Sequence, residues 1–204
     1  MRGRPHMVIG GAAGAAVGFL LHAAPLGVVA CAAVGALGGL LPDIDHAHST
    51  LGRYVPWPAA ERRGRGDFVA HGRRWFGGRV VWHRGETHSV GAAAIAALGA
   101  AGITGWGAWR AAGWLAARGS APLHPLVLGA GAGAALLAGY VSHLVADTVN
   151  RSPQMLWWPF KRRMVHPPWR GWPEASPAGR TAEAVGEVAA VLLAVALAIH
   201  THTP

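Results

Sequence analysis

Charged residues are scarce in this sequence: they make up only 13% of its 204 residues, and just 9 residues are acidic. A soluble domain usually carries about 25% charged residues, so an ordinary soluble fold is disfavoured. Apolar residues reach 52%, and Ala, Gly, Leu and Val supply them more than aromatic residues do. Small residues allow helices to approach closely in a bilayer, where tight packing drives their association. The composition therefore indicates a membrane protein.

Cysteine is almost absent. Cys31 is the single cysteine, which excludes an intramolecular disulfide. It lies in a run of Ala, Val and Gly, a setting typical of a buried and inert thiol. Cysteine usage therefore gives no indication of the compartment.

Basic residues, by contrast, are in excess. The formal net charge of +9 would suit a nucleic-acid-binding protein. However, the basic residues lie between apolar segments rather than on a recognisable reading element. Arginines in such positions flank membrane spans and attract anionic lipid headgroups. We therefore expect these basic residues to contact membrane lipids and not nucleic acid.

Four apolar regions divide the chain, at residues 7–41, 89–115, 126–149 and 182–199. The last three are each near the roughly 20 residues that a helix needs to cross a bilayer. The chain is long enough for one domain and too short for two large ones. We therefore predict a single integral membrane domain over residues 1–204, an all-α, multi-pass transmembrane helical bundle.

The first apolar region is broken near Pro25. It is consistent with one tilted span plus an interfacial piece, with a hairpin of two short helices, or with a signal peptide that follows Arg2 and Arg4. The apolar run resumes directly after Pro25 and continues to Leu41, which a cleaved signal peptide does not require. We therefore favour a retained helical hairpin.

Two basic loops separate the apolar regions. Residues 42–87 and 150–181 hold most of the arginines, whereas the connector 116–125 holds only Arg118. Because loops rich in Lys and Arg stay on the cytoplasmic side, both basic loops are expected to form a cytoplasmic-face region. The second and third apolar regions then make a hairpin whose tip lies outside.

Three short polar clusters lie at the ends of apolar regions: residues 40–46 (LLPDIDH), 83–89 (HRGETHS) and 139–147 (GYVSHLVAD). His143 and Asp147 are four residues apart, so a helix places both on one face. A neutral imidazole and a carboxylate together suit zinc. All three clusters fall at the same expected membrane face, and this convergence predicts a metal site.

The first two clusters supply further donors. Asp43 and Asp45 point the same way if the chain is extended after Pro42. His83 and His88 bracket a turn that contains glycine. Structural alternatives stay open, because paired aspartates also suit a helix cap or a turn, and a lone histidine such as His83 is more often a surface residue.

Structural explanations also apply to other polar residues. Ionisable residues are costly to place at membrane depth. A functional role is therefore favoured for His143 and Asp147 over the alternative that they are a structural pair. Ser49 and Ser89 have the chemistry of nucleophiles, but the sequence pairs neither with a base. Helix capping is the expected role of both serines.

The motifs resemble those of the YdjM-like family of inner-membrane, metal-dependent hydrolases, whose founding member is LexA-regulated. The matching strings are the three clusters above, together with Ser49, the Leu51-Gly52 pair and the Trp158-Pro159 pair. His6 is similar to a histidine that these proteins carry before the first apolar run. The resemblance extends in order from residue 6 to about residue 165.

The chain also departs from the family pattern. Glu86 stands where an aromatic or aliphatic residue is usual, and residues 150–153 replace a Thr-Pro-x-Gly sequence. The loop before His83 is long. The metal ligands that the resemblance implies are still present. The departures affect the residues that are expected to contact the substrate.

The resemblance implies a hydrolase with a divalent metal, zinc or alternatively manganese, in a bacterial-type cytoplasmic (inner) membrane. A more distant similarity to zinc phospholipase C and its nuclease relatives implies one or more zinc ions. The candidate ligands are His6, Asp43, Asp45, His46, His83, His88, His143 and Asp147.

The resulting hypothesis is metal-assisted hydrolysis of an ester or phosphodiester at the membrane face, with a lipid or lipid-linked phosphoester as the natural substrate. Asp45 or Glu86 would act as general base. Arg84 would stabilise negative charge on the substrate, because its fork geometry suits phosphate. The alternatives are a non-catalytic protein that binds metal or handles a cation, and a lipid-binding scaffold. The sequence gives no indication of oligomeric state.

Overall fold

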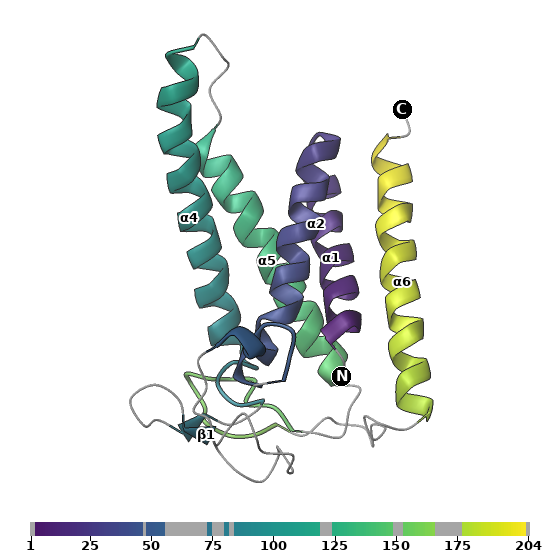
Figure 1. The fold of residues 1–204 in the computed structure, drawn as a ribbon. Helices are drawn as coiled ribbons and strands as arrows, with labels where there is room; N and C mark the ends of the chain where they lie inside the picture. Colours follow the sequence, from purple (N-terminus) through teal and green to yellow (C-terminus); the bar gives the residue numbers. More distant parts are fainter. Residues whose placement is uncertain are drawn as a thin grey trace.

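The computed structural model describes residues 3–46, 48–55, 73–74, 80–81, 84–118, 124–148, 153–165 and 177–202. Helices dominate this part of the chain (Figure 1). The long ones are α1 (Gly3–Leu20), α2 (Pro25–Leu40), α4 (Val90–Ala116), α5 (Pro125–Asp147) and α6 (Pro177–His202). The prediction of an all-α bundle with transmembrane helices is confirmed.

Three segments in the described residues are long and apolar enough to cross a membrane: Pro25–Asp45, Val90–Trp114 and Pro125–Asp147. Helix α6 contains a shorter apolar stretch, Ala184–Ala196. Large apolar side chains such as Ile103 remain exposed on these helices, as expected for surfaces that face lipid.

The first apolar region forms a helical hairpin, in agreement with the favoured interpretation. His22 adopts a left-handed backbone conformation (φ 50°) in the turn that follows α1. Pro25 occupies the first turn of α2, where its missing N–H has no helical partner to lose and its fixed φ suits the helix. The turn and the proline together reverse the chain.

Glycines allow α1, α2 and α5 to pack with their backbones in contact. A Cβ atom added at Gly35 of α2 would lie 2.7 Å from the Cα of Gly14 in α1. One added at Gly139 of α5 would lie 2.7 Å from the carbonyl carbon of Gly35. Both distances are shorter than side chains tolerate, so only glycine fits at this three-helix contact.

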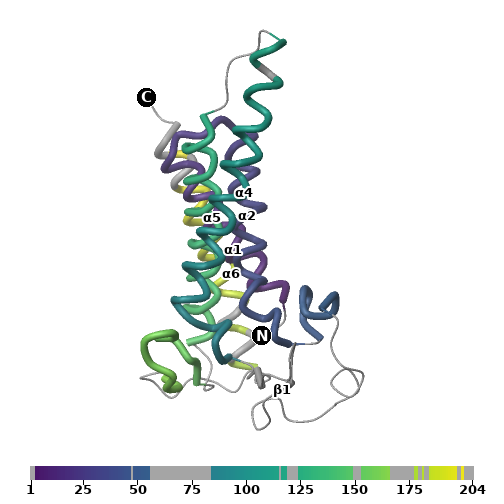
Figure 2. The backbone as a smooth tube through the Cα atoms, turned by 90° about the vertical axis from the view of Figure 1, so that its left-hand side faces the viewer, coloured from purple at the N-terminus to yellow at the C-terminus, as the bar shows by residue number. Residues whose placement is uncertain are grey.

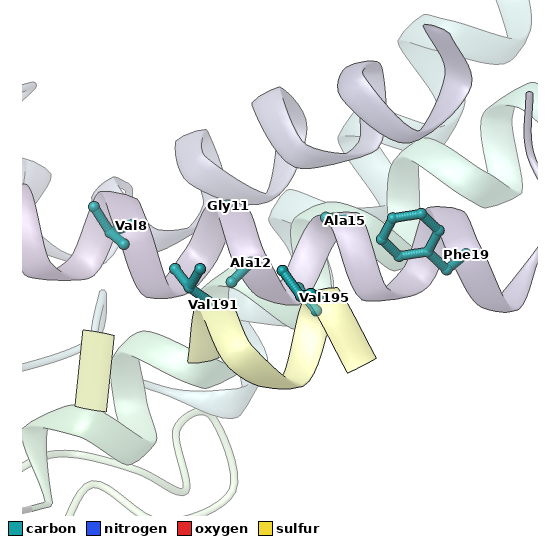
Figure 3. A pocket seen from close by; sticks show the side chains of 8 residues that line it. Val8, Gly11, Ala12, Ala15, Phe19, Val191 and Val195 are labelled. Atoms are coloured by element: carbon teal, nitrogen blue, oxygen red, sulfur yellow. The ribbon is translucent and has the colours of Figure 1, made fainter. Parts of the chain in front are cut away.

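Helix α5 lies at the centre of the bundle, where it contacts α1, α2 and α4, whereas α6 packs on α1 (Figures 1 and 2). An open apolar groove of about 260 Å³ runs between α1 and α6 (Figure 3). Its lining residues are Val8, Gly11, Ala12, Ala15, Phe19, Val191, Ala194 and Val195.

Most described segments outside the long helices gather at one end of the bundle, where α1 and α4 begin and where α2 and α5 end (Figure 1). They contain the 3-10 helices η1 (Pro42–Asp45) and η2 (Gly52–Tyr54) and a small antiparallel ribbon of β1 (Arg73–Arg74) and β2 (Val80–Val81). Ends of helices that are far apart in sequence therefore meet in one place.

The expectation of an extended chain after Pro42 is wrong. Residues Pro42–Asp45 form a 3-10 turn, in which the His46 N–H donates to the Asp43 carbonyl at 2.9 Å. Proline fits the first position of a helical turn, so the chain continues to coil as it leaves α2. The coil separates the directions of Asp43 and Asp45.

Candidate metal centre

Five side chains from four segments converge at the loop end of the bundle. His6 comes from the start of α1, Asp43 from η1, His88 from the loop before α4, and His143 and Asp147 from the end of α5. The Asp43 side chain is 14% exposed, and each of the other four residues is at most 1% exposed. The cluster is therefore almost closed to solvent, and Asp43 marks its open side.

The donor atoms are spaced as ligands of one ion would be. His88 Nε2 and His143 Nε2 lie 3.3 Å apart. Asp43 Oδ1 lies 3.4 Å and 3.7 Å from these two nitrogens, and Asp147 Oδ2 lies 3.4 Å and 3.6 Å from them. Two donors that share one tetrahedral zinc ion are about 3.3–3.5 Å apart, since each lies about 2.0–2.2 Å from the metal.

The tautomer of His143 is fixed by its backbone partner. Its Nδ1 lies 2.7 Å from the carbonyl oxygen of Gly39, and a carbonyl can only accept a hydrogen bond. Nδ1 therefore carries the proton and donates it, and Nε2 presents a lone pair to the cluster. A histidine ligand held in this way is typical of metal sites.

The charges of the cluster also favour a divalent cation. Asp43, Asp45 and Asp147 are grouped around His88 and His143, and the guanidinium of Arg84 is the cation that contacts Asp147. Carboxylates that are buried close together are costly unless positive charge lies among them. A divalent ion would supply that charge.

The pKa of His88 responds to these charges. Burial alone would lower it, but the carboxylates of Asp147 and Asp43 outweigh burial and raise the pKa to about 9. A proton on His88 thus partly replaces the positive charge that the cluster needs.

His6 lies behind His143. The two rings stack with centroids 3.7 Å apart, and His6 Nε2 lies 3.5 Å from Asp147 Oδ1. Within the described residues, His6 Nδ1 and Asp147 Oδ1 are buried without a hydrogen-bond partner. Buried polar atoms of this kind are expected where an ion or water completes a site.

Two overlapping ligand groups can be formed: His6, Asp43 and His143, or His88, His143 and Asp147. Both use His143, whose Nδ1 is already bound to Gly39. A single Nε2 atom can bind only one ion, so the groups are alternative choices for one metal and not two separate sites.

Arg84 is held in the site by its backbone as well as its charge. The residue is 4% exposed, and Nη2 lies 3.4 Å from Asp147 Oδ1. Its φ of 60° is unusual for a residue with a side chain and costs on the order of 1–3 kcal/mol. The Arg84 carbonyl accepts a hydrogen bond from the Met155 N–H at 2.9 Å, which stabilises the conformation.

Several residues proposed from sequence are placed differently. Asp45 lies at the other edge of His88, with Oδ2 3.8 Å from Nδ1, and belongs to neither ligand group. His46 also lies outside both groups, and its Nδ1 accepts a hydrogen bond from the His48 N–H. Glu86 is half-buried and in neither group, and His83 lies outside the described residues.

The two serines are structural, as expected. Ser89 Oγ accepts a hydrogen bond from the Ala92 N–H at 3.1 Å and so caps the start of α4. Ser49 Oγ accepts a hydrogen bond from the Gly52 N–H at 2.8 Å, at the start of η2. Neither hydroxyl is available as a nucleophile in this arrangement.

The Trp158-Pro159 segment also supports the site. The carbonyls of Leu156 and Trp158 accept hydrogen bonds from the N–H groups of Val90 and Gly91, at 2.9 Å and 3.1 Å. These N–H groups belong to the first turn of α4, which has no internal partners for them. The segment therefore fixes the start of α4 and with it the loop that carries His88.

Sequence reasoning missed two residues of the site, Thr87 and Tyr140. Thr87 donates a hydrogen bond to Asp45 Oδ2 at 2.6 Å, and the Tyr140 hydroxyl donates to the Thr87 carbonyl. Both lie inside the motifs, and Tyr140 is one helical turn before His143. That spacing is the only sign of their role in the sequence.

The chain matches the model of a known protein family. The family described as YdjM inner membrane protein matches residues 1–203, which include the whole cluster. This result confirms the family predicted from the motifs. No curated protein and no solved structure matches the chain.

Proposed function

The chain belongs to the YdjM family of inner membrane proteins, and from this premise we propose that it is a metal-dependent hydrolase of esters or phosphodiesters at the membrane face. One observation carries the proposal: the Nε2 atoms of His88 and His143 lie 3.3 Å apart, and one oxygen of Asp43 and one of Asp147 each lie 3.4–3.7 Å from both nitrogens. The residues that would hold the metal are His88, His143, Asp43 and Asp147.

The donor set suits zinc, because two imidazoles and two carboxylates are common zinc ligands. Manganese is the alternative, since it also accepts carboxylate and imidazole donors. A bound divalent ion would polarise the scissile group of a substrate and lower the pKa of a water molecule. His6 would hold Asp147 and His143 in place through its stacking contact and its Nε2 atom.

Arg84 favours a phosphoester among the candidate substrates. Its guanidinium lies beside Asp147 at the edge of the cluster, where it would bind phosphate oxygens. Planar guanidinium groups bind phosphate through two parallel hydrogen bonds, and such charge-assisted bonds are strong. Glu86, half-buried on the same loop, is the candidate proton acceptor.

The depth of the cluster favours a lipid or lipid-linked substrate. Asp43 lies near the end of the candidate span Pro25–Asp45, and Asp147 is the last residue of the span Pro125–Asp147. The ends of membrane spans lie near the lipid headgroups, where the phosphoesters of membrane lipids are found. We also propose that the chain crosses the membrane several times.

The alternative is a non-catalytic protein that binds a metal structurally or handles a cation. Residues that conduct ions are expected in mid-span around a water-filled path. Here the ionisable residues lie at span ends, and Asp43 opens to the loop side. The position therefore favours an interfacial enzyme.

Hydrolysis is tested with the full chain in detergent, after removal of metal and reloading with zinc. The substrates are bis(p-nitrophenyl) phosphate and vesicles of phosphatidylglycerol with phosphatidylethanolamine. We expect hydrolysis by the wild type, loss of activity in His88→Ala, and full activity in His124→Ala, a matched change at the far end of α5. Equal rates for wild type and His88→Ala would contradict catalysis and support the alternative.

A further inference from the structure

His88 has neighbours at both of its ring nitrogens. Nε2 faces the metal cluster, 3.4 Å from Asp43 Oδ1 and 3.4 Å from Asp147 Oδ2. On the opposite edge, Nδ1 lies 3.3 Å from the hydroxyl oxygen of Thr87 and 3.8 Å from Asp45 Oδ2. The two aspartates of the first motif thus lie on opposite sides of one imidazole.

The direction of the hydrogen bonds follows from donor chemistry. Thr87 has one hydroxyl proton, and its oxygen lies 2.6 Å from Asp45 Oδ2. An ionised carboxylate only accepts, so the hydroxyl donates to Asp45. The lone pairs of the Thr87 oxygen then remain to accept from His88 Nδ1–H. In the neutral imidazole that binds a metal, this order places the proton on Nδ1, so that Nε2 presents its lone pair to the cluster.

Tyr140 ties the same loop to the helix that carries the other ligands. Its hydroxyl donates to the Thr87 carbonyl, and the residue is only 3% exposed. Because Tyr140 lies on α5, one turn before His143, the Thr87 peptide is held at a fixed place beside His143 and Asp147. The network therefore orients the His88 ring and also sets its position relative to α5.

We propose that Asp45, Thr87 and Tyr140 are positioning residues, which hold His88 with Nε2 toward the metal, and that Asp45 is not itself a ligand. The inference rests on the proposed metal site. Hydrogen-bonded partners behind a histidine ligand fix its tautomer and orientation, and their loss typically weakens metal affinity about 10- to 100-fold.

The test is a cobalt(II) titration of the metal-free full chain in detergent, followed by visible absorption. Thr87→Val removes the hydroxyl and keeps the shape, and Asp45→Asn removes the charge. We expect both variants to bind one cobalt ion with about 10- to 100-fold lower affinity and an altered absorption band. Thr87→Ser restores the hydroxyl and should bind as the wild type does.

Thr181→Val is the matched control, because its hydroxyl donates to the Pro177 carbonyl at the start of α6 and belongs to neither ligand group. It should leave affinity and spectrum unchanged. Thermal unfolding of each metal-free variant identifies any that fails to fold. If Thr87→Val does so, Tyr140→Phe takes its place with the same expected loss of affinity.

Three results would overturn this inference and leave the metal site itself standing. Wild-type affinity in both Asp45→Asn and Thr87→Val would show that the network does not act on His88. Loss of all binding in Asp45→Asn at saturating cobalt would make Asp45 a ligand. If Thr87→Ser failed to bind cobalt as the wild type does, the hydroxyl group would be excluded as the feature that positions His88. A wild type that binds no cobalt would instead contradict both the metal site and the proposed function. Failure of the positioning network can therefore be distinguished from failure of the proposed function.

Discussion

His88 and His143 turn the same ring nitrogen toward each other, although one comes from a loop and the other from α5. Their Nε2 atoms are 3.3 Å apart, and the Nδ1 atoms are engaged with Thr87 and Gly39. Two lone pairs at this distance repel unless a cation or a proton lies between them. The protonation of His88 is therefore directly linked to metal binding.

Metal affinity should rise with pH over an unusually wide range. Below its pKa of about 9, His88 is protonated in the metal-free site, so binding displaces a proton and affinity increases about tenfold per pH unit. A histidine with the ordinary pKa of about 6.5 would give a constant affinity above pH 7. Zinc competition titrations between pH 7 and about 9.5 distinguish a His88 pKa of about 9 from one of about 6.5. A zinc affinity that stays constant over this range would contradict the raised pKa of His88.

Arg84 should contribute to catalysis and not to metal content. Arg84→Lys keeps the charge beside Asp147 but loses the planar fork that suits phosphate. We expect kcat/KM for a phosphodiester to fall about 10- to 100-fold, the equivalent of one hydrogen bond to a charged group. Metal analysis of the same sample provides the control, because lost metal would show that Arg84 acts on the ligands.

Several residues of the site could be found from the sequence, and others could not. The four-residue spacing of His143 and Asp147 is sufficient to place them together on a helix. The separate roles of Asp43 and Asp45 depend on the 3-10 turn at Pro42, which no periodicity indicates. The role of Thr87 depends on a contact with Asp45 across 42 positions of the chain, which local sequence does not encode.

At the scale of helices, glycines determine how closely the ligand-bearing elements approach. Gly35 of α2 contacts Gly14 of α1 and Gly139 of α5, and these helices carry or lead to His6, Asp43 and His143. Side chains at this contact would separate the helices and pull the donor atoms apart. The glycine contact is thus a structural requirement of the metal centre.

Gly139→Ala should destabilise the bundle and reduce metal content. The added methyl group would overlap the backbone of Gly35, and overpacking of this kind costs about 1–3 kcal/mol. Gly102→Ala on α4 is the matched control, since its Cβ would meet no atom within 4 Å. Thermal unfolding in detergent compares the two, and equal melting temperatures would contradict the packing argument.

The bounds of the long helices could be predicted closely from the apolar regions of the sequence. The second and third regions correspond to α4 and α5 to within one or two residues, because a bilayer-spanning helix needs a long apolar run. Helix α1 begins at Gly3, earlier than its apolar run suggests. Its first turn contains Pro5, which fits there because it loses no helical hydrogen bond, and His6, whose side chain contacts His143 and Asp147.

At the scale of the whole molecule, the described parts of the two basic loops lie at the same end of the bundle as the metal centre (Figure 1). This arrangement agrees with the charge pattern, in which the connector after α4 carries only Arg118. The positive-inside rule then predicts that the metal centre faces the cytoplasm.

Cysteine labelling tests this orientation. In a Cys31→Ala background, Arg118→Cys should react with an impermeant maleimide added to intact spheroplasts. Tyr54→Cys, at a position that is 79% exposed in η2, the turn that contacts the η1 segment of Asp43, should react only after permeabilisation. The reverse pattern would place the site on the outer face and contradict the predicted topology.

The most direct test of the metal centre is elemental analysis of the detergent-purified protein, with His143→Ala as the comparison. His143 belongs to both ligand groups, so the loss of its side chain should remove the metal whichever group binds it. We expect about one zinc or manganese ion per chain in the wild type and none in the variant, with both proteins folded. A wild type without metal after reconstitution, or a variant that keeps it, would contradict the account.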